Sequence, residues 1–165
     1  MNIDSTAIRR LRDNLLSQAR HDQRWAEGND GTELELAVLR RVEPFAETMF
    51  LVMMADGDPA SVEREALVAA LEVLTDAQLR RAEIDAMLDR FQSNVERSGA
   101  EARLAQIGAV VCADRDDRET AFTLGAVIAL ADDRVDVREN RTLEWVQEYF
   151  GLSDRRVASL INAID

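Results

Sequence analysis

The sequence predicts an all-α protein that folds as one domain, a bundle of about seven to eight helices. Apolar residues recur at three- and four-residue spacing along nearly the whole chain, which is the period of a helix with one buried face. Only two prolines and seven glycines interrupt the 165 residues, so turn signals of the kind that separate short strands are few. The hydrophobic content of 47% is sufficient for a sizeable core, and no apolar run reaches the length of a membrane span.

In the first half of the chain, each predicted helix is bounded by a turn or a cap. A helix over about 5–26 ends at the glycine-containing stretch 27–31. The next apolar stripe runs over 34–53. It contains Pro44, whose missing N–H and bulky ring predict a kink or a short break near Glu43. A turn at 55–59 then precedes a helix over about 61–74.

In the second half, two capping boxes predict helix starts. Thr75 with Gln78 begins a helix that reaches about residue 97 before Gly99, and Asp116 with Glu119 begins the helix that contains residues 122–130. The remaining apolar stripes predict a segment over 104–113, a helix over 143–150 that ends at Gly151, and a short last helix that Ser153 caps.

The chain also matches itself at an offset of 76 residues. This offset aligns Val52–Asp56 with Ile128–Asp132 without gaps, and it places Glu63 on Glu139. We interpret the match as a duplicated helical hairpin and predict that the two copies pack around a pseudo-twofold axis. The domain 1–165 then comprises an N-terminal helix and linker over 1–30, a first repeat over 35–98 and a second repeat over 100–165.

Charge and cysteine usage exclude several classes of function. Acidic residues outnumber basic ones by 32 to 20, and a net charge of −12 repels nucleic acids and anionic lipid surfaces. All the basic residues are arginines, spread along the chain without a basic patch. Cys112 is the only cysteine, so there is no intramolecular disulfide and no cysteine-built zinc site. We expect a cytoplasmic protein that neither binds nucleic acid nor inserts into a membrane. The oligomeric state stays open.

The repeated pattern resembles a known family. Ala55-Asp56-Gly57 is followed six residues later by Glu63, and Ala131-Asp132 is followed in the same register by Glu139. Over roughly 35–165 the chain resembles the tellurite-resistance TerB-like family, and the same module is similar to the N-terminal domain of membrane-anchored DnaJ-like co-chaperones. The resemblance implies an all-helical, non-enzymatic, cytoplasmic stress-response module. It also implies acidic residues that hold a divalent metal and protein partners at the cytoplasmic face of the inner membrane.

The acidic turns supply the candidate metal ligands. Four positions carry over from the resemblance, and Asp58 and Asp136 are added from their spacing in the same turns. The candidate set is Asp56, Asp58, Glu63, Asp132, Asp136 and Glu139. Hard cations such as Ca²⁺ and Mg²⁺ prefer carboxylate oxygens, although the position of an EF-hand's closing glutamate is occupied by leucine in both copies. Three interpretations stay open for these residues: helix capping alone, a weak metal site, or a surface that docks a basic partner.

No motif for an organic cofactor or for nucleophilic catalysis occurs in the sequence. We therefore expect a protein that is not an enzyme. The alternative is a metal-dependent enzyme that uses paired carboxylates within a helical bundle. The direction of the acidic side chains separates the two, because catalysis needs a water-excluded cleft and docking needs an open face.

Overall fold

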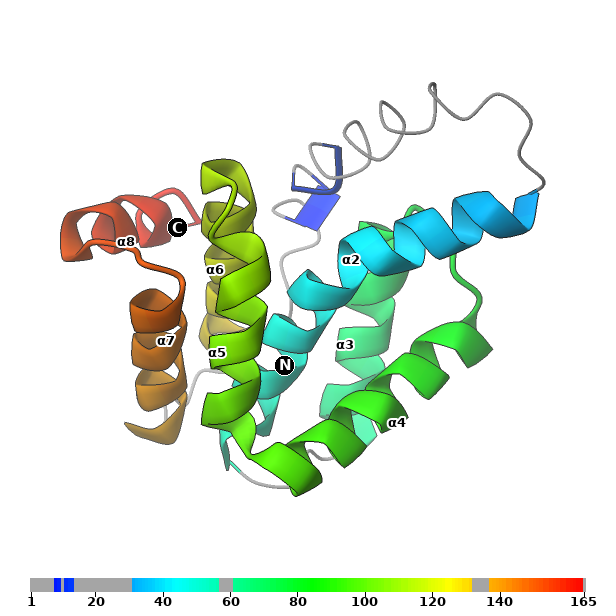
Figure 1. Cartoon of the computed structure of the whole chain (residues 1–165), viewed down its shortest axis with the longest axis horizontal. Coiled ribbons are helices and arrows are strands. Elements are labelled where there is room, and N and C mark those ends of the chain that lie inside the picture. The colour runs from blue at the N-terminus through cyan, green and yellow to red at the C-terminus, as the bar shows by residue number, and fades with distance from the viewer. Residues whose placement is uncertain (1–7, 10, 14–30, 57–60, 132–136, 165) are drawn as a thin grey trace.

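The structure is a computed structural model that describes residues 8–9, 11–13, 31–56, 61–131 and 137–164. Within these ranges every regular element is helical and no strand occurs, which confirms the predicted fold class (Figure 1). Residues 8, 9 and 11–13 are helical and belong to the first predicted helix. The remaining elements are α2 (Gly31–Met53), the 3₁₀ helix η1 (Met54–Asp56), α3 (Ser61–Leu74), α4 (Arg81–Ser98), α5 (Ala100–Val111), α6 (Arg115–Leu130), α7 (Val137–Tyr149) and α8 (Asp154–Ile161).

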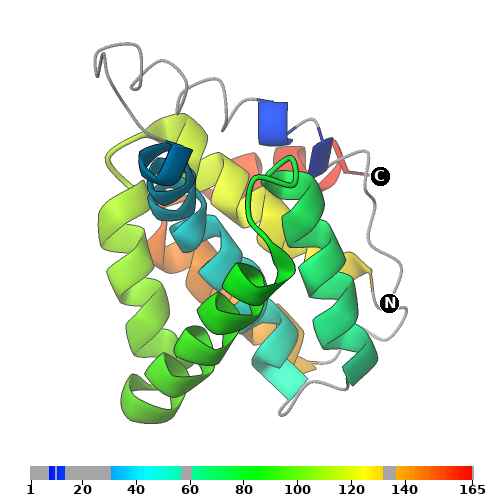
Figure 2. The same cartoon turned by 90° about the vertical axis from the view of Figure 1, so that its right-hand side faces the viewer.

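Helix α2 lies at the centre of the bundle. It packs against α3, α4, α5, α6 and α7, and most extensively against α6 (Figures 1 and 2). The sequence predicts a kink or a short break near Glu43. The helix continues through Pro44 without a break, and Figure 1 shows α2 bending along its length. The hydroxyl of Thr48 donates to the carbonyl oxygen of Pro44 at 2.8 Å within this stretch.

The hydrophobic core is built around the aromatic rings. All five phenylalanines are fully buried: Phe45, Phe50, Phe91, Phe122 and Phe150. The rings of Phe50 on α2 and Phe91 on α4 lie 5.8 Å apart between centroids in a tilted arrangement. Such aromatic pairs add to the stabilisation that burial alone provides, so they help to join α4 to the central helix.

Helices α2 and α6 run in the same direction. Near the start of α6, Asp117 pairs with Arg41 of α2, and these two positions are 76 residues apart. Farther along, a Cβ added at Gly125 would lie 3.3 Å from Val52 and 3.5 Å from Thr48. Sequence number therefore increases the same way along both helices, and their C-terminal ends lie at the same end of the molecule.

The helix boundaries also follow the repeat. Helix α3 begins at residue 61 and α7 begins at residue 137, again 76 residues apart. Glu43 and Glu119, which correspond at the same offset, pair with Arg90 of α4 and Arg156 of α8 respectively. The pseudo-twofold relation between the two copies stays a prediction.

Two of the predicted helix starts are wrong. Asp76 and Ala77 adopt φ angles of 53° and 54°, which end α3, and Thr75 donates to the carbonyl oxygen of Leu71 at 2.9 Å. Thr75 therefore serves the end of α3. Helix α4 begins only at Arg81, where the carboxylate of Glu83 accepts from the backbone N–H of Arg80 at 2.7 Å.

The start of α6 lies before the predicted capping box. The carboxylate of Asp114 accepts from the backbone N–H groups of Asp116 at 2.7 Å and Asp117 at 3.2 Å, so Asp114 is the N-cap. The predicted partner Glu119 is held by two arginines instead.

The predicted boundaries at glycines and at the last helix are confirmed. Gly99 has a φ of 81° at the end of α4, and Gly151 has a φ of 65° after α7. The hydroxyl of Ser153 accepts from the backbone N–H of Arg156 at 3.4 Å and caps α8. In the part of the chain that the structure describes, none of the helices has the length and hydropathy that crossing a bilayer requires.

Candidate functional site

The six predicted metal ligands are only partly covered by the structure. Asp58, Asp132 and Asp136 lie outside the described residues, and for Asp56 and Glu139 the backbone alone is described. Asp56 ends η1, directly after α2, and Glu139 lies in the first turn of α7. How the carboxylates of the two acidic turns are arranged therefore stays a prediction.

Glu63 is the one predicted ligand whose side chain is described. It lies half-buried in the first turn of α3, where a carboxylate complements the positive end of the helix dipole. Among the described side chains, no three histidines, cysteines or carboxylates converge as a metal site would require. Capping by Glu63 therefore stands as an alternative to metal binding.

The two elements from which the acidic turns continue, η1 and α6, nevertheless end at the same end of the bundle. Because α2 and α6 run in the same direction, the chain leaves η1 at Asp56 and α6 at Leu130 at one end of the molecule. Helix η1 also packs against α7, the helix that follows the second acidic turn. The first turn therefore starts from an element that packs against the helix into which the second turn leads.

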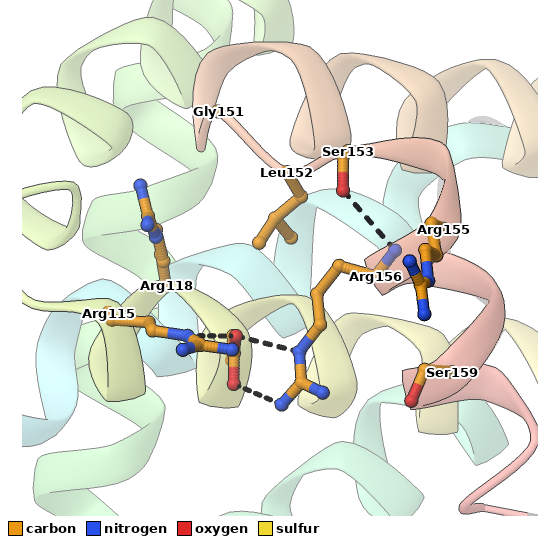
Figure 3. Close-up of a pocket in the computed structure, with 9 residues that line it drawn as sticks. Arg115, Arg118, Gly151, Leu152, Ser153, Arg155, Arg156 and Ser159 are labelled. Atoms are coloured by element: carbon orange, nitrogen blue, oxygen red, sulfur yellow. Dashed lines mark hydrogen bonds and ion pairs between the residues drawn. The ribbon is translucent and has the colours of Figure 1, made fainter.

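At the opposite end of α6 the structure shows an open pocket of about 540 Å³. The first turns of α6 line one side of it, and the turn between α7 and α8 together with α8 lines the other. We call it the arginine pocket, because Arg115, Arg118, Arg155 and Arg156 line it with one carboxylate, that of Glu119 (Figure 3). The guanidinium and carboxylate charges of its lining sum to about +3.

Glu119 is the electrostatic centre of the arginine pocket. Arg156 donates from Nε and Nη2 to its two carboxylate oxygens at 2.7 and 2.6 Å, and Arg115 donates from Nε at 2.9 Å (Figure 3). These hydrogen bonds, first of all those from Arg156, lower the pKa of Glu119 to about 2. The carboxylate therefore stays ionised over the whole physiological range and joins α6 to α8.

The other two arginines of the pocket have no such partner. The Nε of Arg118 is buried without a hydrogen bond, and Arg155 is exposed and forms no ion pair with the described part of the chain. A Cβ added at Gly151 would lie 3.8 Å from Nη1 of Arg118, so the bare backbone of the α7–α8 turn passes close to this guanidinium.

The other side of the same turn carries the opposite charge. Glu144, Glu148 and Asp154 line a second pocket there, of about 430 Å³. Asp154 already accepts a hydrogen bond from Gln147 at 2.6 Å. The arginines thus line the α6 side of the turn, and three carboxylates line its other side.

The arginine pocket as a whole has no signature in the sequence, and the expectation that no basic patch forms is wrong at this place. The two pairs of arginines are separated by about 40 residues of chain, and only the packing of α8 on α6 brings them together. One of its ion pairs does have a sequence signal. Glu119 lies four residues after Arg115, and this spacing favours an ion pair on a helix surface instead of a capping role.

Comparison with known proteins supports the resemblance found in the sequence. The family model described as "Tellurite resistance protein TerB" matches residues 43–162, which is more than half of the chain. The match spans both acidic turns and the arginine pocket. No curated protein and no solved structure matches the chain. The similarity to DnaJ-like co-chaperones stays a prediction. Because the family model covers most of the sequence, the chain belongs to the TerB family.

Proposed function

We propose that this TerB-family protein is a non-enzymatic stress-response module that binds through its two acidic turns acting together. The ligand is a divalent cation of the Ca²⁺ or Mg²⁺ type, a basic segment of a protein partner, or both in combination. The module acts in the cytoplasm, with its partner at the cytoplasmic face of the inner membrane, and it uses no organic cofactor. Membership of the tellurite-resistance family supports this role.

The observation that carries the proposal is the direction of α2 and α6. Arg41 pairs with Asp117 near one end of the two helices, and Gly125 approaches Val52 toward the other. Both acidic turns therefore begin at the same end of the bundle. Two turns at opposite ends of the bundle could not bind one ligand together.

The chemistry of this end suits a cation. Asp56 and Asp132 follow the C-terminal ends of α2 and α6, where the helix dipoles are negative and stabilise positive charge. Carboxylates from two turns supply the several oxygen ligands that Ca²⁺ or Mg²⁺ needs. Without a cation, the same carboxylates repel one another, and a basic peptide segment relieves that repulsion as well.

Thermal unfolding of the full chain over a series of divalent cations tests the proposal. A cation present at 100 times its dissociation constant adds about 2.7 kcal/mol to the free energy of unfolding. For a chain of this size that corresponds to a rise in Tm of about 5–10 °C. The rise should disappear in the Asp56→Asn/Asp132→Asn double variant and persist in Glu72→Gln, which removes one exposed negative charge at the far end of α3.

The capping interpretation predicts a different result. Losing a helix cap costs about 1 kcal/mol, and the costs of two distant caps add. Additive destabilisation that does not depend on the cation, with unchanged binding of a basic peptide, would contradict the proposal. No Tm shift with any cation, but weaker binding of a basic peptide to the double variant, would assign the turns to protein docking alone.

A further inference from the structure

Two guanidinium groups of the arginine pocket are available to a ligand. Arg115 and Arg156 are engaged with Glu119, whereas Arg118 and Arg155 have no acceptor among the described residues. Arg118 lines the pocket, and its Nη1 would lie 3.8 Å from a Cβ added at Gly151, which is also in the lining, so this guanidinium is placed to meet an acceptor there. The pocket therefore presents two guanidinium groups to an anionic ligand.

The two available groups lie on opposite sides of the pocket. Figure 3 shows Arg118 beside Gly151 at one side and Arg155 beyond Ser153 at the other, with the side chain of Leu152 between them. Arg156, bound to the carboxylate of Glu119, lies along the edge that connects the two sides. A ligand that engages both arginines must therefore be extended and must carry negative charge at more than one point.

We propose that the arginine pocket binds a small molecule through a polyphosphate group, one phosphate lying at Arg118 and another at Arg155. This site goes beyond the proposed function, because it uses other residues at the other end of α6. Planar guanidinium groups donate two parallel hydrogen bonds to phosphate oxygens. The N-terminus of α8, capped by Ser153, adds the positive end of a helix dipole to the same side. The volume of about 540 Å³ is in the range of small-molecule sites and exceeds what a single phosphate fills.

The charge of the whole chain favours a small molecule over a macromolecular polyanion. A nucleic acid or an acidic protein would extend over a surface whose net charge is −12 and be repelled. The carboxylates of Glu144 and Glu148 begin on the other side of the α7–α8 turn. A compact ligand stays within the screening length of about 8 Å around the guanidinium groups, so it experiences mainly their attraction.

Titration of the full chain with tripolyphosphate and, separately, with orthophosphate at constant ionic strength tests the proposal. Calorimetry gives the dissociation constants, and backbone amide shifts locate the site. We expect tripolyphosphate to bind at least tenfold more tightly than orthophosphate, with shifts at Gly151, Ser153 and Arg155. Arg118→Gln and Arg155→Gln should each weaken tripolyphosphate binding about tenfold. Arg40→Gln removes the same charge from an exposed position on α2 and should leave the binding unchanged.

Several outcomes would overturn the proposal. Equal affinity for the two phosphates would exclude two-point binding, and equal losses in the Arg40 and Arg118 variants would show a non-specific charge effect. A glutamate hexapeptide that binds as tightly as tripolyphosphate would assign the pocket to an acidic protein segment. Arg155 is exposed, so its substitution keeps the fold and provides the decisive variant even where Arg118→Gln does not fold.

Discussion

The ion-pair cluster around Glu119 predicts an acid-dependent loss of stability that Glu119→Gln removes. In the folded protein the pKa of Glu119 is lowered from 4.5 to about 2, chiefly by the hydrogen bonds from Arg156. A carboxyl group whose pKa is depressed by folding stabilises the native state above its unfolded pKa. That stabilisation disappears as the pH falls from about 4.5 to about 2.

The magnitude follows from the size of the shift. Each pKa unit corresponds to about 1.4 kcal/mol, so the full shift sets a ceiling of about 3.4 kcal/mol. The side chain of Glu119 is 12% exposed, but those of Arg115 and Arg156 are 65% and 37% exposed, so solvent screens part of the interaction. We expect Glu119→Gln to lower the free energy of unfolding by about 2 kcal/mol at pH 7.

Urea unfolding followed by circular dichroism at pH 7, 4.5 and 2.5 provides the test. The difference between the wild type and Glu119→Gln should shrink to about a quarter of its pH 7 value at pH 2.5. At that pH the carboxyl group of the unfolded chain is protonated, so ionising Glu119 in the folded protein favours folding much less. Glu65→Gln is the matched control. Its ion pair with Arg81 involves side chains that are 62% and 47% exposed, and removing it should cost about 0.5 kcal/mol or less. A difference for Glu119→Gln that is the same at pH 7 and 2.5, or absent at pH 7, would refute the reasoning.

Two further predictions concern the packing of α5. A Cβ at Gly108 would lie 2.5 Å from the backbone oxygen of Tyr149, so Gly108→Ala should destabilise the fold by about 2 kcal/mol or more, although alanine has the higher helix propensity. Gly125→Ala is the control, because the new methyl group meets only movable side-chain methyls, and it should cost less than about 1 kcal/mol. Equal urea midpoints for the two variants would contradict this prediction. Arg103 donates to both carboxylate oxygens of the buried Glu47 at 2.7 Å. Arg103→Leu should therefore lower the free energy of unfolding by about 3 kcal/mol, because it leaves a buried carboxylate unpaired. The Glu47→Leu/Arg103→Leu double variant should regain most of that stability. A double variant less stable than the single one in the same unfolding assay would show that the ion pair itself stabilises the fold.

The sequence was sufficient to predict the helices because their apolar period is local information. The ends marked by Gly99, Gly151 and Ser153 were predicted correctly, since a left-handed glycine or a capping hydroxyl acts within one turn of chain. The errors arose where one short motif had two possible partners. The spacing of Thr75 and Gln78 predicts the start of the next helix, whereas the structure places Thr75 at the end of α3, because Asp76 and Ala77 take positive φ angles.

The candidate sites could be predicted less well, for a different physical reason. The two acidic turns carry a repeated spacing that the sequence shows directly, but their common end depends on α2 and α6 running in the same direction. The arginine pocket has no repeated spacing. Arg118 and Arg155 become neighbours of one cavity only because α8 packs on the start of α6, and the four arginines look like ordinary solvated helix residues before that contact is known.

Helix α6 also determines how the two proposals relate to each other. It begins at the arginine pocket and ends just before the second acidic turn, and its 16 residues span about 24 Å. At physiological salt this is about three times the screening length of roughly 8 Å. A cation bound at the acidic turns therefore contributes little to the potential at Arg118 through solvent, and a polyphosphate bound at Arg118 contributes equally little at Asp132. The Asp56/Asp132 variants and the Arg118 and Arg155 variants thus test separate sites, and failure of one experiment leaves the other proposal standing.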